Sequence, residues 1–513
     1  MNKIHQREYQ LNAIKEMLSF KEDRLCVCLS TGGGKTVIFS GFTKLFLSNN
    51  PGAKVLIAVN RIELLNQTVS TLSNVYGITP GIINRGSKSK PCTSVVVAMV
   101  ETLFRRLNKW NFQDINVLII DECHKGDFFK ILPIFKKIYG FSATPIYQKK
   151  GSCLADYYHN IIVPTTLKQL IENKYVSNAR TYAPELKLDK STVHIKGDDY
   201  DEIEVGKKLS EVNFIQQVVK YYERFKEHRA IIYNSSIEHS LEVTKYLKLA
   251  GANVRHLDGG TDKNERKHIF EWLKKTPGAW LCNVDVATTG VDVPEVTLIM
   301  INRLTRSLSL YIQMCGRGGR SIKPGESKYI DEKDEFIILD MHANCFQLGE
   351  WQDDRDWSVL FNERKKKKEG VAPVKSCPNC DAIISAGSTT CIYCNYVFEK
   401  TQSRENNEFE INLIEVSKIR NEAVKLIKLA EKREYKPISV VFKSLEIYGK
   451  ELQSGNITPE QFREKSLIVA NEYYKSQGFE KMNMGHIGFI EKLCDQKLNE
   501  LASINENQKA YTY

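Results

Sequence analysis

Short apolar segments alternate with helical patterns between residues 24 and 145 of the chain. The apolar segments are RLCVCLS, KVLIAV, SVVVAMV, NVLIID and KIYGFSAT, and most intervals between them carry apolar residues at helical spacing. Strands that alternate with helices in this way build a parallel sheet with helices packed on both faces. We therefore predict a doubly wound α/β domain over residues 1–150.

A second series of the same kind spans residues 228–360. Its apolar segments are RAIIYN, NVRHLDG, AWLCNVD, VTLIMIN and EFIILD, so two α/β domains in tandem are predicted. Residues 151–227 form the expected connector, in which the polar piece LDKSTVHIKGDDYDEIE indicates a flexible surface loop. A basic linker is expected over 361–375, a cysteine cluster occupies 376–400, and a helical accessory domain is expected over 401–513.

Composition and charge limit the class of function without fixing it. The chain is 42% hydrophobic and 26% charged, which is ordinary for a globular protein. Its formal net charge of +11 fits a polyanionic partner and fits a slightly basic enzyme equally well. Apart from one cluster the 13 cysteines are scattered, which favours reduced thiols and a cytoplasmic location. The polar start MNKIHQREYQ and the lack of long apolar runs predict neither a secretory leader nor a membrane span.

A glycine-rich segment, STGGGKT, follows the first apolar segment and precedes a helical pattern. Glycines allow backbone N–H groups to curl around phosphates, and the helix that follows directs its N-terminus at the same anion. Lys35 is predicted to hold the β- and γ-phosphates and Thr36 to bind Mg²⁺. Leu29 stands where the usual pattern begins with glycine, so a plain turn before a helix is the alternative. The predicted phosphate-binding residues are Ser30, Thr31, Gly32, Gly33, Gly34, Lys35 and Thr36.

The segment NVLIIDECHKGD ends an apolar strand on two adjacent acids, followed by Cys123 and His124. Taken alone, it fits a metal site, a cysteine nucleophile with a histidine base, or half of a nucleotide site. A phosphate loop needs a second strand with acids at its carboxyl end, because ligands of parallel sheets bind at that edge. Asp121 is then predicted to hold Mg²⁺, and Glu122 to orient and deprotonate the attacking water.

The segment QMCGRGGR places Arg317 three residues before Arg320, so the two would share one face if the segment is helical. Guanidinium groups match the oxygens of a phosphoryl group in transfer, and both arginines are predicted to act there. Gln313 is predicted to reach the attacking water. A solvated basic helix face is the alternative, although glycines beside the arginines do not favour a helix.

Taken in chain order, these segments resemble the motifs of superfamily 2 helicases and translocases. DECH is similar to their DEAD/DEAH box, GFSATP to motif III, REYQ to the upstream glutamine motif, VNRIELLNQ to motif Ia, VAMVETL to motif Ib, NVDVATTGVDVPEV to motif V and QMCGRGGR to motif VI. The resemblance covers residues 1–360 and implies two RecA-like domains with ATP bound between them. It points to the DNA-directed subgroup of restriction-enzyme motors and phage branch-migration helicases of the UvsW type.

The resemblance implies further ATP contacts. Arg7 and Gln10, in REYQ, would recognise the adenine base. Gly290 and Asp292, in motif V, would join the ATP site from the second domain.

The resemblance also implies contacts that concern nucleic acid. Ser142 and Thr144 would link the state of ATP to the grip on nucleic acid, and Thr289 would contact the strand. Arg61 and Arg306 are predicted to contact phosphates, with ordinary surface salt bridges as the alternative.

Two CxxC pairs stand ten residues apart in CPNCDAIISAGSTTCIYC. Cys377, Cys380, Cys391 and Cys394 are predicted to close a tetrahedral, structural Zn²⁺ site, and the segment resembles a zinc ribbon. Iron or a redox dithiol is the alternative. The lysines at 365–368 fit either a phosphate contact or a solvated linker.

Together these features predict an ATP-dependent helicase or translocase that uses Mg²⁺ and acts on DNA, forked or branched DNA included. The same motor acting on RNA, and an ATP-gated clamp that does not unwind, are the rival hypotheses. A protein partner is expected to use the zinc ribbon or the C-terminal helical region.

Overall fold

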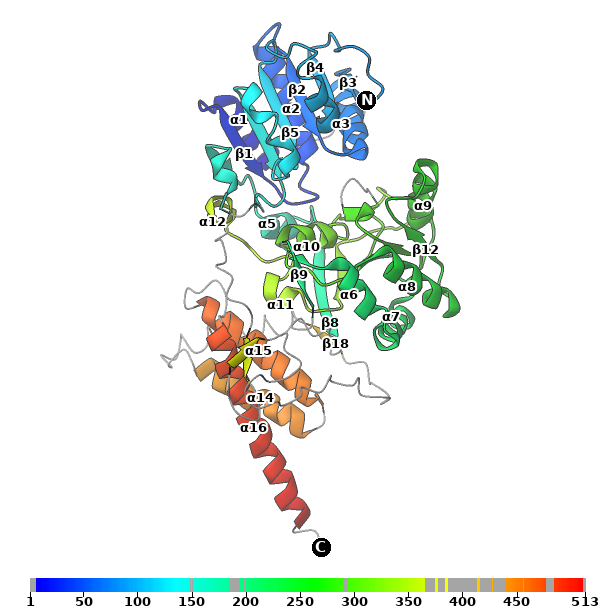
Figure 1. Cartoon of the computed structure of the whole chain (residues 1–513), viewed down its shortest axis with the longest axis vertical. Coiled ribbons are helices and arrows are strands. Elements are labelled where there is room, and N and C mark those ends of the chain that lie inside the picture. The colour runs from blue at the N-terminus through cyan, green and yellow to red at the C-terminus, as the bar shows by residue number, and fades with distance from the viewer. Residues whose placement is uncertain are drawn as a thin grey trace.

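The computed structural model contains two lobes, each built on a seven-stranded sheet, followed by a group of C-terminal helices (Figure 1). The residues that the structure describes are 6–147, 149, 151–184, 193–197, 199–288, 293–364, 374–376, 383–385, 413–415, 427, 439–454, 456–476 and 484–510. The four clustered cysteines and residues 289–292 lie outside this set, so the predicted zinc ligands and the predicted motif V contacts Thr289, Gly290 and Asp292 are not described.

The sheet of the first lobe has the strand order β3-β4-β2-β5-β6-β1-β7, and every neighbouring pair is parallel. Its strands are β1 (Arg24–Cys28), β2 (Val55–Val59), β3 (Gly81–Ile83), β4 (Val95–Met99), β5 (Val117–Asp121), β6 (Ile138–Ser142) and β7 (Asn160–Ile162). Its helices are α1 (Glu8–Ser19), α2 (Lys35–Asn49), α3 (Ile62–Tyr76) and α4 (Val100–Arg106), with 3₁₀ turns at Gly126–Phe128, Leu132–Ile134 and Leu154–Asp156.

Both faces of this sheet are buried, which explains why its strands are apolar without alternation. In β2, Val55 and Ile57 pack in the cluster that includes residues of α1, α2 and α3. Leu56 and Ala58 point the other way, into a second cluster that includes residues of α4 and the segment 128–135. The alternating side chains of each strand therefore serve two cores.

The sheet of the second lobe has the order β12-β13-β11-β14-β15-β8-β18. All of its pairs are parallel except β18 with β8, which is antiparallel. Its strands are β8 (Asn178–Pro184), β11 (Ala230–Asn234), β12 (Val254–Leu257), β13 (Trp280–Asn283), β14 (Leu298–Asn302), β15 (Glu335–Asp340) and β18 (Leu413–Glu415). The helices of this lobe are α5 (Leu167–Glu172), α6 (Glu202–Leu209), α7 (Val212–Phe225), α8 (Ile237–Leu249), α9 (Lys263–Lys275), α10 (Leu308–Cys315) and α11 (Cys345–Leu348), with a 3₁₀ turn at Val286–Thr288. Helix α12 (Trp357–Asn362) returns to the first lobe, where Phe361 packs in the cluster on the α4 face of the sheet.

The segment expected to connect the domains, residues 151–227, contributes more structure than a connector would. Its strand β8 pairs with β15 from Asn178 to Tyr182 and extends the second sheet. Within the piece expected to be a surface loop, β9 (Ile195–Lys196) pairs antiparallel with β10 (Asp199–Tyr200), and α6 follows directly. The strand NARTYAP carries few large apolar residues, so the alternation of buried positions leaves a weak signal in the sequence.

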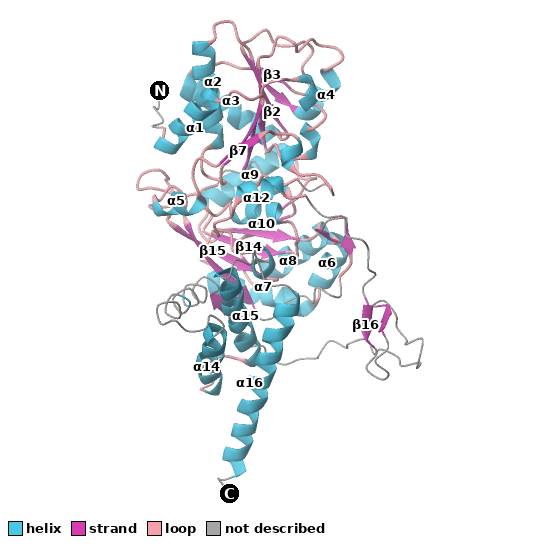
Figure 2. Cartoon of the chain, turned by 90° about the vertical axis from the view of Figure 1, so that its left-hand side faces the viewer, coloured by secondary structure: helices cyan, strands magenta, loops and turns pink. Residues whose placement is uncertain are grey.

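The C-terminal region is helical, as predicted. It contains α14 (Ser439–Gln453), α15 (Pro459–Ser476) and α16 (Met484–Ala510), and α16 extends well beyond the others (Figure 1; Figure 2). Helix α15 begins at Pro459, and the Gln461 N–H donates to the Thr458 hydroxyl at 3.2 Å, which caps its first turn. Val441 and Phe462 share one apolar cluster with Ile299 of β14, so this region packs on the second lobe.

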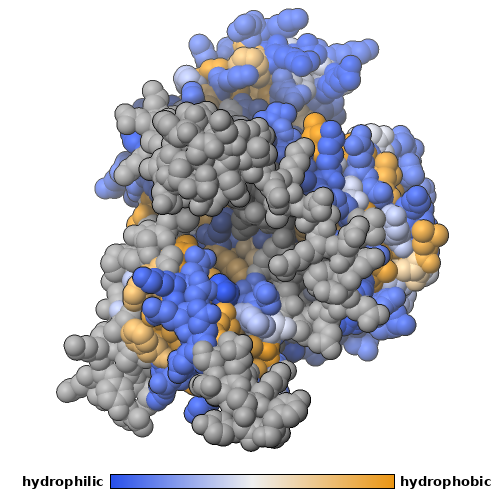
Figure 3. Space-filling model, turned by 60° about the horizontal axis from the view of Figure 1, so that its bottom comes forward, coloured by the Kyte–Doolittle hydropathy of each residue, from blue (hydrophilic) through white to orange (hydrophobic). Residues whose placement is uncertain are grey.

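Where Figure 3 colours the surface at this end, hydrophilic side chains lie beside apolar groups. Among the helices that the structure describes, none is both long and apolar enough to cross a bilayer. A further strand pair, β16 (Val374–Ser376) with β17 (Ile383–Ser385), is antiparallel and flanks the first CxxC pair in the sequence (Figure 2).

Candidate active site

The glycine-rich segment forms a compact loop between β1 and α2. Gly32 and Gly34 have φ values of +86° and +85°, a left-handed conformation that strains residues with a Cβ. Leu29, the departure from the usual pattern, is 1% exposed and lies beneath the loop. A Cβ at Gly33 would stand 2.7 Å from Leu29 Cγ, so the leucine fills the space inside the loop.

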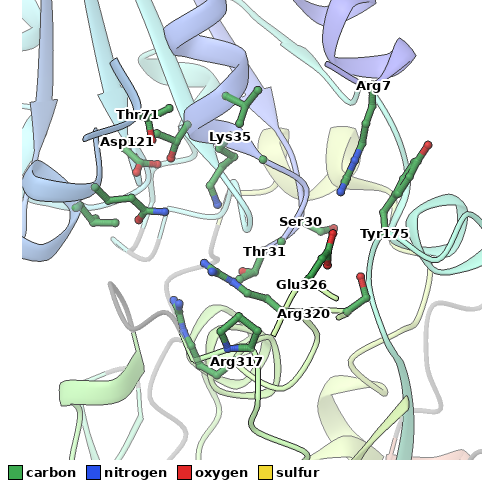
Figure 4. A pocket seen from close by; sticks show the side chains of 18 of the residues that line it. Arg7, Ser30, Thr31, Lys35, Thr71, Asp121, Tyr175, Arg317, Arg320 and Glu326 are labelled. Carbon is green, nitrogen blue, oxygen red and sulfur yellow. The ribbon is translucent and has the colours of Figure 1, made fainter. Parts of the chain in front are cut away.

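A cavity of about 430 Å³ lies between the lobes, next to this loop (Figure 4). It brings together these predicted site residues: Arg7, Ser30, Thr31, Gly32, Gly34, Lys35, Thr36, Asp121, Glu122, Arg317 and Arg320. Gln10, Gly33 and Gln313 are not among the lining residues. Residues that sequence reasoning missed also line it: Val37, Leu64, Gln67, Thr71, Tyr175, Pro294, Ser321, Lys323 and Glu326. Leu64, Gln67 and Thr71 share one face of α3, a spacing that could have indicated them.

The two acids lie where β5 ends, beside the lysine of the loop. Lys35 Nζ is 3.6 Å from Glu122 Oε1, and Glu122 has a φ of +57°. Burial, followed by the neighbouring Glu122, raises the pKa of Asp121 to about 7. Burial alone would raise the pKa of Glu122, but the positive groups around it, Lys35 first and then His124, Lys125 and Arg317, together hold this pKa below its ordinary value. The pair therefore combines a charged Glu122 carboxylate with an Asp121 carboxyl group whose charged form a nearby cation would stabilise.

His124 connects the acids to the segment of motif III. Its Nδ1 is 2.8 Å from the Ser142 hydroxyl, which accepts the Thr144 N–H at 3.0 Å. Burial lowers the pKa of His124 to about 4, so the ring is neutral at pH 7. The Ser142 hydroxyl can donate to Nδ1 or accept from it, so this hydrogen bond forms with either neutral tautomer of His124. Glu122 Oε2 stands 3.5 Å from the same Nδ1.

Cys123 takes no part in this arrangement. Its sulfur lies 3.9 Å from Cys26 Sγ, and the side chain is fully buried in the apolar cluster on the α4 face of the sheet. A cysteine nucleophile with a histidine base is therefore excluded here, because the Cys123 sulfur lies in the apolar cluster beside Cys26 whereas the His124 ring contacts Ser142.

The two arginines reach the cavity from a loop and not from a helix. Helix α10 ends at Cys315, and Arg320 forms an isolated β-bridge with Val176. The helix on which the arginines would share a face therefore does not extend to them, although both line the cavity. Rings of Phe336 and Trp351 pack where side chains at positions 318 and 319 would stand, so the glycines let the chain turn close to the sheet.

Gln313 faces a different pocket, of about 440 Å³, which His124, Lys125 and Arg306 also line. This position does not agree with its predicted contact to the attacking water, since Gln313 stays on α10 while the chain leaves the helix before Arg317.

The Arg306 N–H donates to Asp199 Oδ1 at 2.6 Å. Arg61 Nη1 donates to the Val286 carbonyl of the other lobe at 3.4 Å. The predicted nucleic-acid roles of both arginines stay predictions.

Two family models match the chain over the parts that build this site. The type III restriction enzyme res subunit model matches residues 3–147, which hold the phosphate loop and both acids. The helicase conserved C-terminal domain model matches residues 211–321, which hold Arg317 and Arg320. The protein is an ATP-dependent helicase or translocase of superfamily 2. This helicase is therefore an ATPase, as predicted.

Curated relatives of the helicase cover much of its length. A 51.5 kDa protein of a Lactococcus phage (isolate 7-9) is 29% identical over 413 residues, 78% of this chain and 84% of that one. A candidate ATP-dependent helicase of Saccharomyces cerevisiae, IRC3, is 29% identical over 339 residues, 61% of this chain and 49% of that one. The DNA 3′-5′ translocase XPB2 of Sulfurisphaera tokodaii is 24% identical over 362 residues, 62% of this chain and 79% of that one. The helicase thus matches about half the length of the yeast relative.

A solved structure supports the fold. A fragment of a candidate HsdR subunit of a type I restriction enzyme from Vibrio vulnificus superposes with a TM-score of 0.53 and 19% identity, covering 68% of this chain and 66% of that one. Together with the two parallel sheets, this confirms the predicted pair of RecA-like domains followed by C-terminal helices.

Proposed function

We propose that the helicase couples ATP hydrolysis to movement along, or separation of, the strands of DNA, forked and branched DNA included. The observation that supports this most is the single cavity lined by the phosphate loop and acids of one lobe and the arginines of the other. Hydrolysis in such a cavity favours one arrangement of the lobes before it and another after it. A nucleic acid held by both lobes would then be moved once per cycle.

DNA is preferred over RNA because of the relatives. The relative XPB2 is named as a DNA 3′-5′ translocase. The family model that matches residues 3–147 and the solved HsdR fragment both come from restriction enzymes. A net charge of +11 suits any polyanion and does not separate the two. Contacts mainly to phosphates would make sequence preference weak.

The chemistry follows from the groups around the cavity. The Thr36 hydroxyl and the Asp121 carboxylate offer the hard oxygen ligands that Mg²⁺ prefers, and both line the cavity. Bound with ATP, Mg²⁺ would neutralise charge on the β- and γ-phosphates. Lys35 holds the γ-phosphate, and Glu122 takes the proton of the attacking water.

The arginines complete the site from the second lobe. Arg317 and Arg320 enter the same cavity as Lys35 and would bind the γ-phosphate oxygens as their charge spreads in the transition state. Cross-lobe contacts exist around this site, since Arg266 Nη1 is 3.5 Å from Glu63 Oε1. Hydrogen bonds join His124 to Ser142 and Ser142 to Thr144. These contacts would link the acids to the pocket that His124 and Arg306 line.

The test is the rate of ATP hydrolysis with single-stranded, duplex and branched DNA and with RNA as activators. We expect DNA to stimulate turnover and RNA of equal length and charge to stimulate it less. Heparin serves as the control for a polyanion without bases. Equal stimulation by RNA and DNA would remove the preference for DNA, and no stimulation by any nucleic acid would contradict a nucleic-acid motor.

The cysteine cluster carries a separate proposal, that a structural zinc ion folds a small ribbon after the second lobe. The strands β16 and β17 support it, since their antiparallel pairing places the first CxxC pair between them in the sequence. Purified protein should contain about one zinc per chain, because four thiolates close a tetrahedral site. Cys391→Ser should release the metal and spare basal ATP turnover, and protein without zinc would end the proposal.

A further inference from the structure

Lys333 is a lysine buried inside the second lobe, in the segment that precedes β15. It is only 4% exposed. Its ammonium donates to the Pro294 carbonyl at 2.6 Å and to the Val296 carbonyl at 2.7 Å. A charged donor forms stronger hydrogen bonds with carbonyl groups than a neutral one does. The side chain of Lys333 therefore holds the segment that precedes β14.

The main chain of Lys333 is fixed to the segment that follows the two arginines. Lys333 and Ile322 form an antiparallel β-bridge, in which both N–H to carbonyl distances are 2.9 Å. Ile322 stands two residues after Arg320. The Ser177 hydroxyl donates to the Lys333 carbonyl at 3.3 Å, and the Ser177 N–H donates to the Gly319 carbonyl at 2.8 Å. Lys333 therefore joins the segment before β14 to the loop that carries Arg320.

Both of these segments line the ATP cavity. Pro294 lines it from the segment before β14, and Arg320, Ser321 and Lys323 line it from the loop. Figure 4 shows Arg320 across the cavity from Lys35 of the first lobe. A donor to the transition state contributes most when it is already held where the charge develops. The spacing of the two segments therefore affects how well the Arg320 guanidinium can meet a phosphate.

The charges of Lys333 and Arg320 also act on each other. Burial, followed by the nearby Arg320, lowers the pKa of Lys333 to about 7, and Glu295 opposes this shift. Burial lowers the pKa of Arg320 to about 10. Repulsion between the ammonium and the guanidinium favours the arrangement in which the Arg320 side chain points away from Lys333. Since Arg320 lines the cavity, this repulsion acts in the same direction as the spacing of the segments.

The stability of the fold alone does not account for an ammonium at this position. A buried charge loses its hydration, and an apolar side chain of similar shape often serves a fold equally well. A methionine at position 333 would leave the two carbonyls without their donor, which lowers stability, but it would also remove the cost of the buried charge. These two effects oppose each other, so Lys333→Met is expected to fold.

We propose that Lys333 is a positioning residue of the ATP site, which holds the loop of Arg320 against the segment of Pro294 so that the guanidinium meets the γ-phosphate in the transition state. This role rests on the one proposed above for Arg320. Lys333 is not among the residues that line the cavity, so it would act through the loop and not by contact with ATP. A displacement of about 1 Å at such a site lowers the rate by a factor on the order of 10².

The first experiment compares kcat and KM for ATP in the full-length protein. Lys333→Met should lower kcat by a factor of about 10 to 100 and leave KM nearly unchanged, because the contact that suffers is made in the transition state. Lys328→Met, which replaces an exposed lysine of the same segment, is the matched control and should retain the wild-type values. A raised KM with unchanged kcat, or wild-type turnover in Lys333→Met, would contradict the proposed role.

Thermal unfolding of the same variants separates positioning from folding. Lys333→Met should unfold within about 4 °C of the wild-type protein, since its two effects on stability oppose each other. A Lys333→Met protein that does not fold would overturn the proposal, because the ammonium would then be required by the fold itself.

A double-mutant cycle with Arg320 gives the decisive measurement. In the Arg320→Ala protein, Lys333→Met should lower the single-turnover rate of hydrolysis by less than about twofold, because no guanidinium is left to position. If Lys333→Met lowered the rate by the same factor with and without Arg320, the two residues would act independently and Lys333 would not position the arginine. Arg320→Ala alone tests the function proposed for Arg320: wild-type hydrolysis in this variant would remove that function and the role of Lys333 with it. Slow hydrolysis in Arg320→Ala with independent effects in the double variant would remove the role of Lys333 alone.

Discussion

Replacing Lys35 with alanine is expected to lower ATP turnover by a factor on the order of 10² to 10³ or more, since one preorganised donor to developing charge contributes this much. Lys35 is the first residue of α2, and its side chain is only 12% exposed at the floor of the cavity. Its ammonium would bind the γ-phosphate, where the helix N-terminus adds to the attraction. No other lysine of the first lobe lines this cavity within the described residues.

The same substitution also affects the neighbouring acid. Lys35 Nζ is 3.6 Å from Glu122 Oε1 and is the largest influence that holds down the pKa of Glu122. Without it, burial favours the protonated form of Glu122, which cannot accept a proton from water. Turnover should therefore fall by two routes, weaker phosphate binding and loss of the base.

Steady-state turnover at saturating Mg²⁺ and nucleic acid measures this effect. Lys44→Ala is the matched control. Lys44 lies exposed on the same helix and does not line the cavity, so its substitution removes an equal charge without changing the site. Turnover in Lys35→Ala that equals that of Lys44→Ala would show that STGGGKT is no phosphate loop. Thermal unfolding of both variants checks that the fold is retained.

The phosphate loop and the two acids, which the sequence indicated, share one property: each is local to a strand and the turn after it. Lys35 follows β1 and Asp121 ends β5, two strands separated by β6, and the parallel strands of one sheet bring their carboxyl ends to the same edge. The positions of these side chains could therefore be predicted from motifs of a few residues, independently of the rest of the chain.

The parts that the sequence did not indicate depend on contacts between distant segments. Tyr175 enters the cavity because Val176 pairs with Arg320, residues that lie far apart in the chain. Strand β8 joins the second sheet by pairing with β15, and the sequence NARTYAP has no local pattern that predicts this pairing. Gln313 was expected near Arg317 on the assumption of a continuous helix, but packing of Phe336 against Gly318 turns the chain first.

The substitution Glu122→Gln is expected to separate binding from hydrolysis. The amide has nearly the shape of the carboxylate, so the backbone at φ +57° and the packing should be kept. An amide cannot take the proton of the attacking water, and loss of a general base lowers the rate by a factor on the order of 10² to 10⁴. Lys35 and Asp121 remain, so ATP affinity should change little.

Asp121→Asn provides the contrast that assigns the two acids. Asp121 is predicted to hold Mg²⁺, and its carboxylate lies in a buried position that favours a cation nearby. The asparagine variant should therefore lose affinity for the Mg²⁺ complex of ATP, while Glu122→Gln should keep it. Titration of a fluorescent ATP analogue, with and without Mg²⁺, measures both affinities, and single-turnover hydrolysis measures the chemical step. If Glu122→Gln lost nucleotide affinity and Asp121→Asn kept it, the roles of metal ligand and base would have to be exchanged, and Lys35 would then lie beside the metal ligand instead of the base.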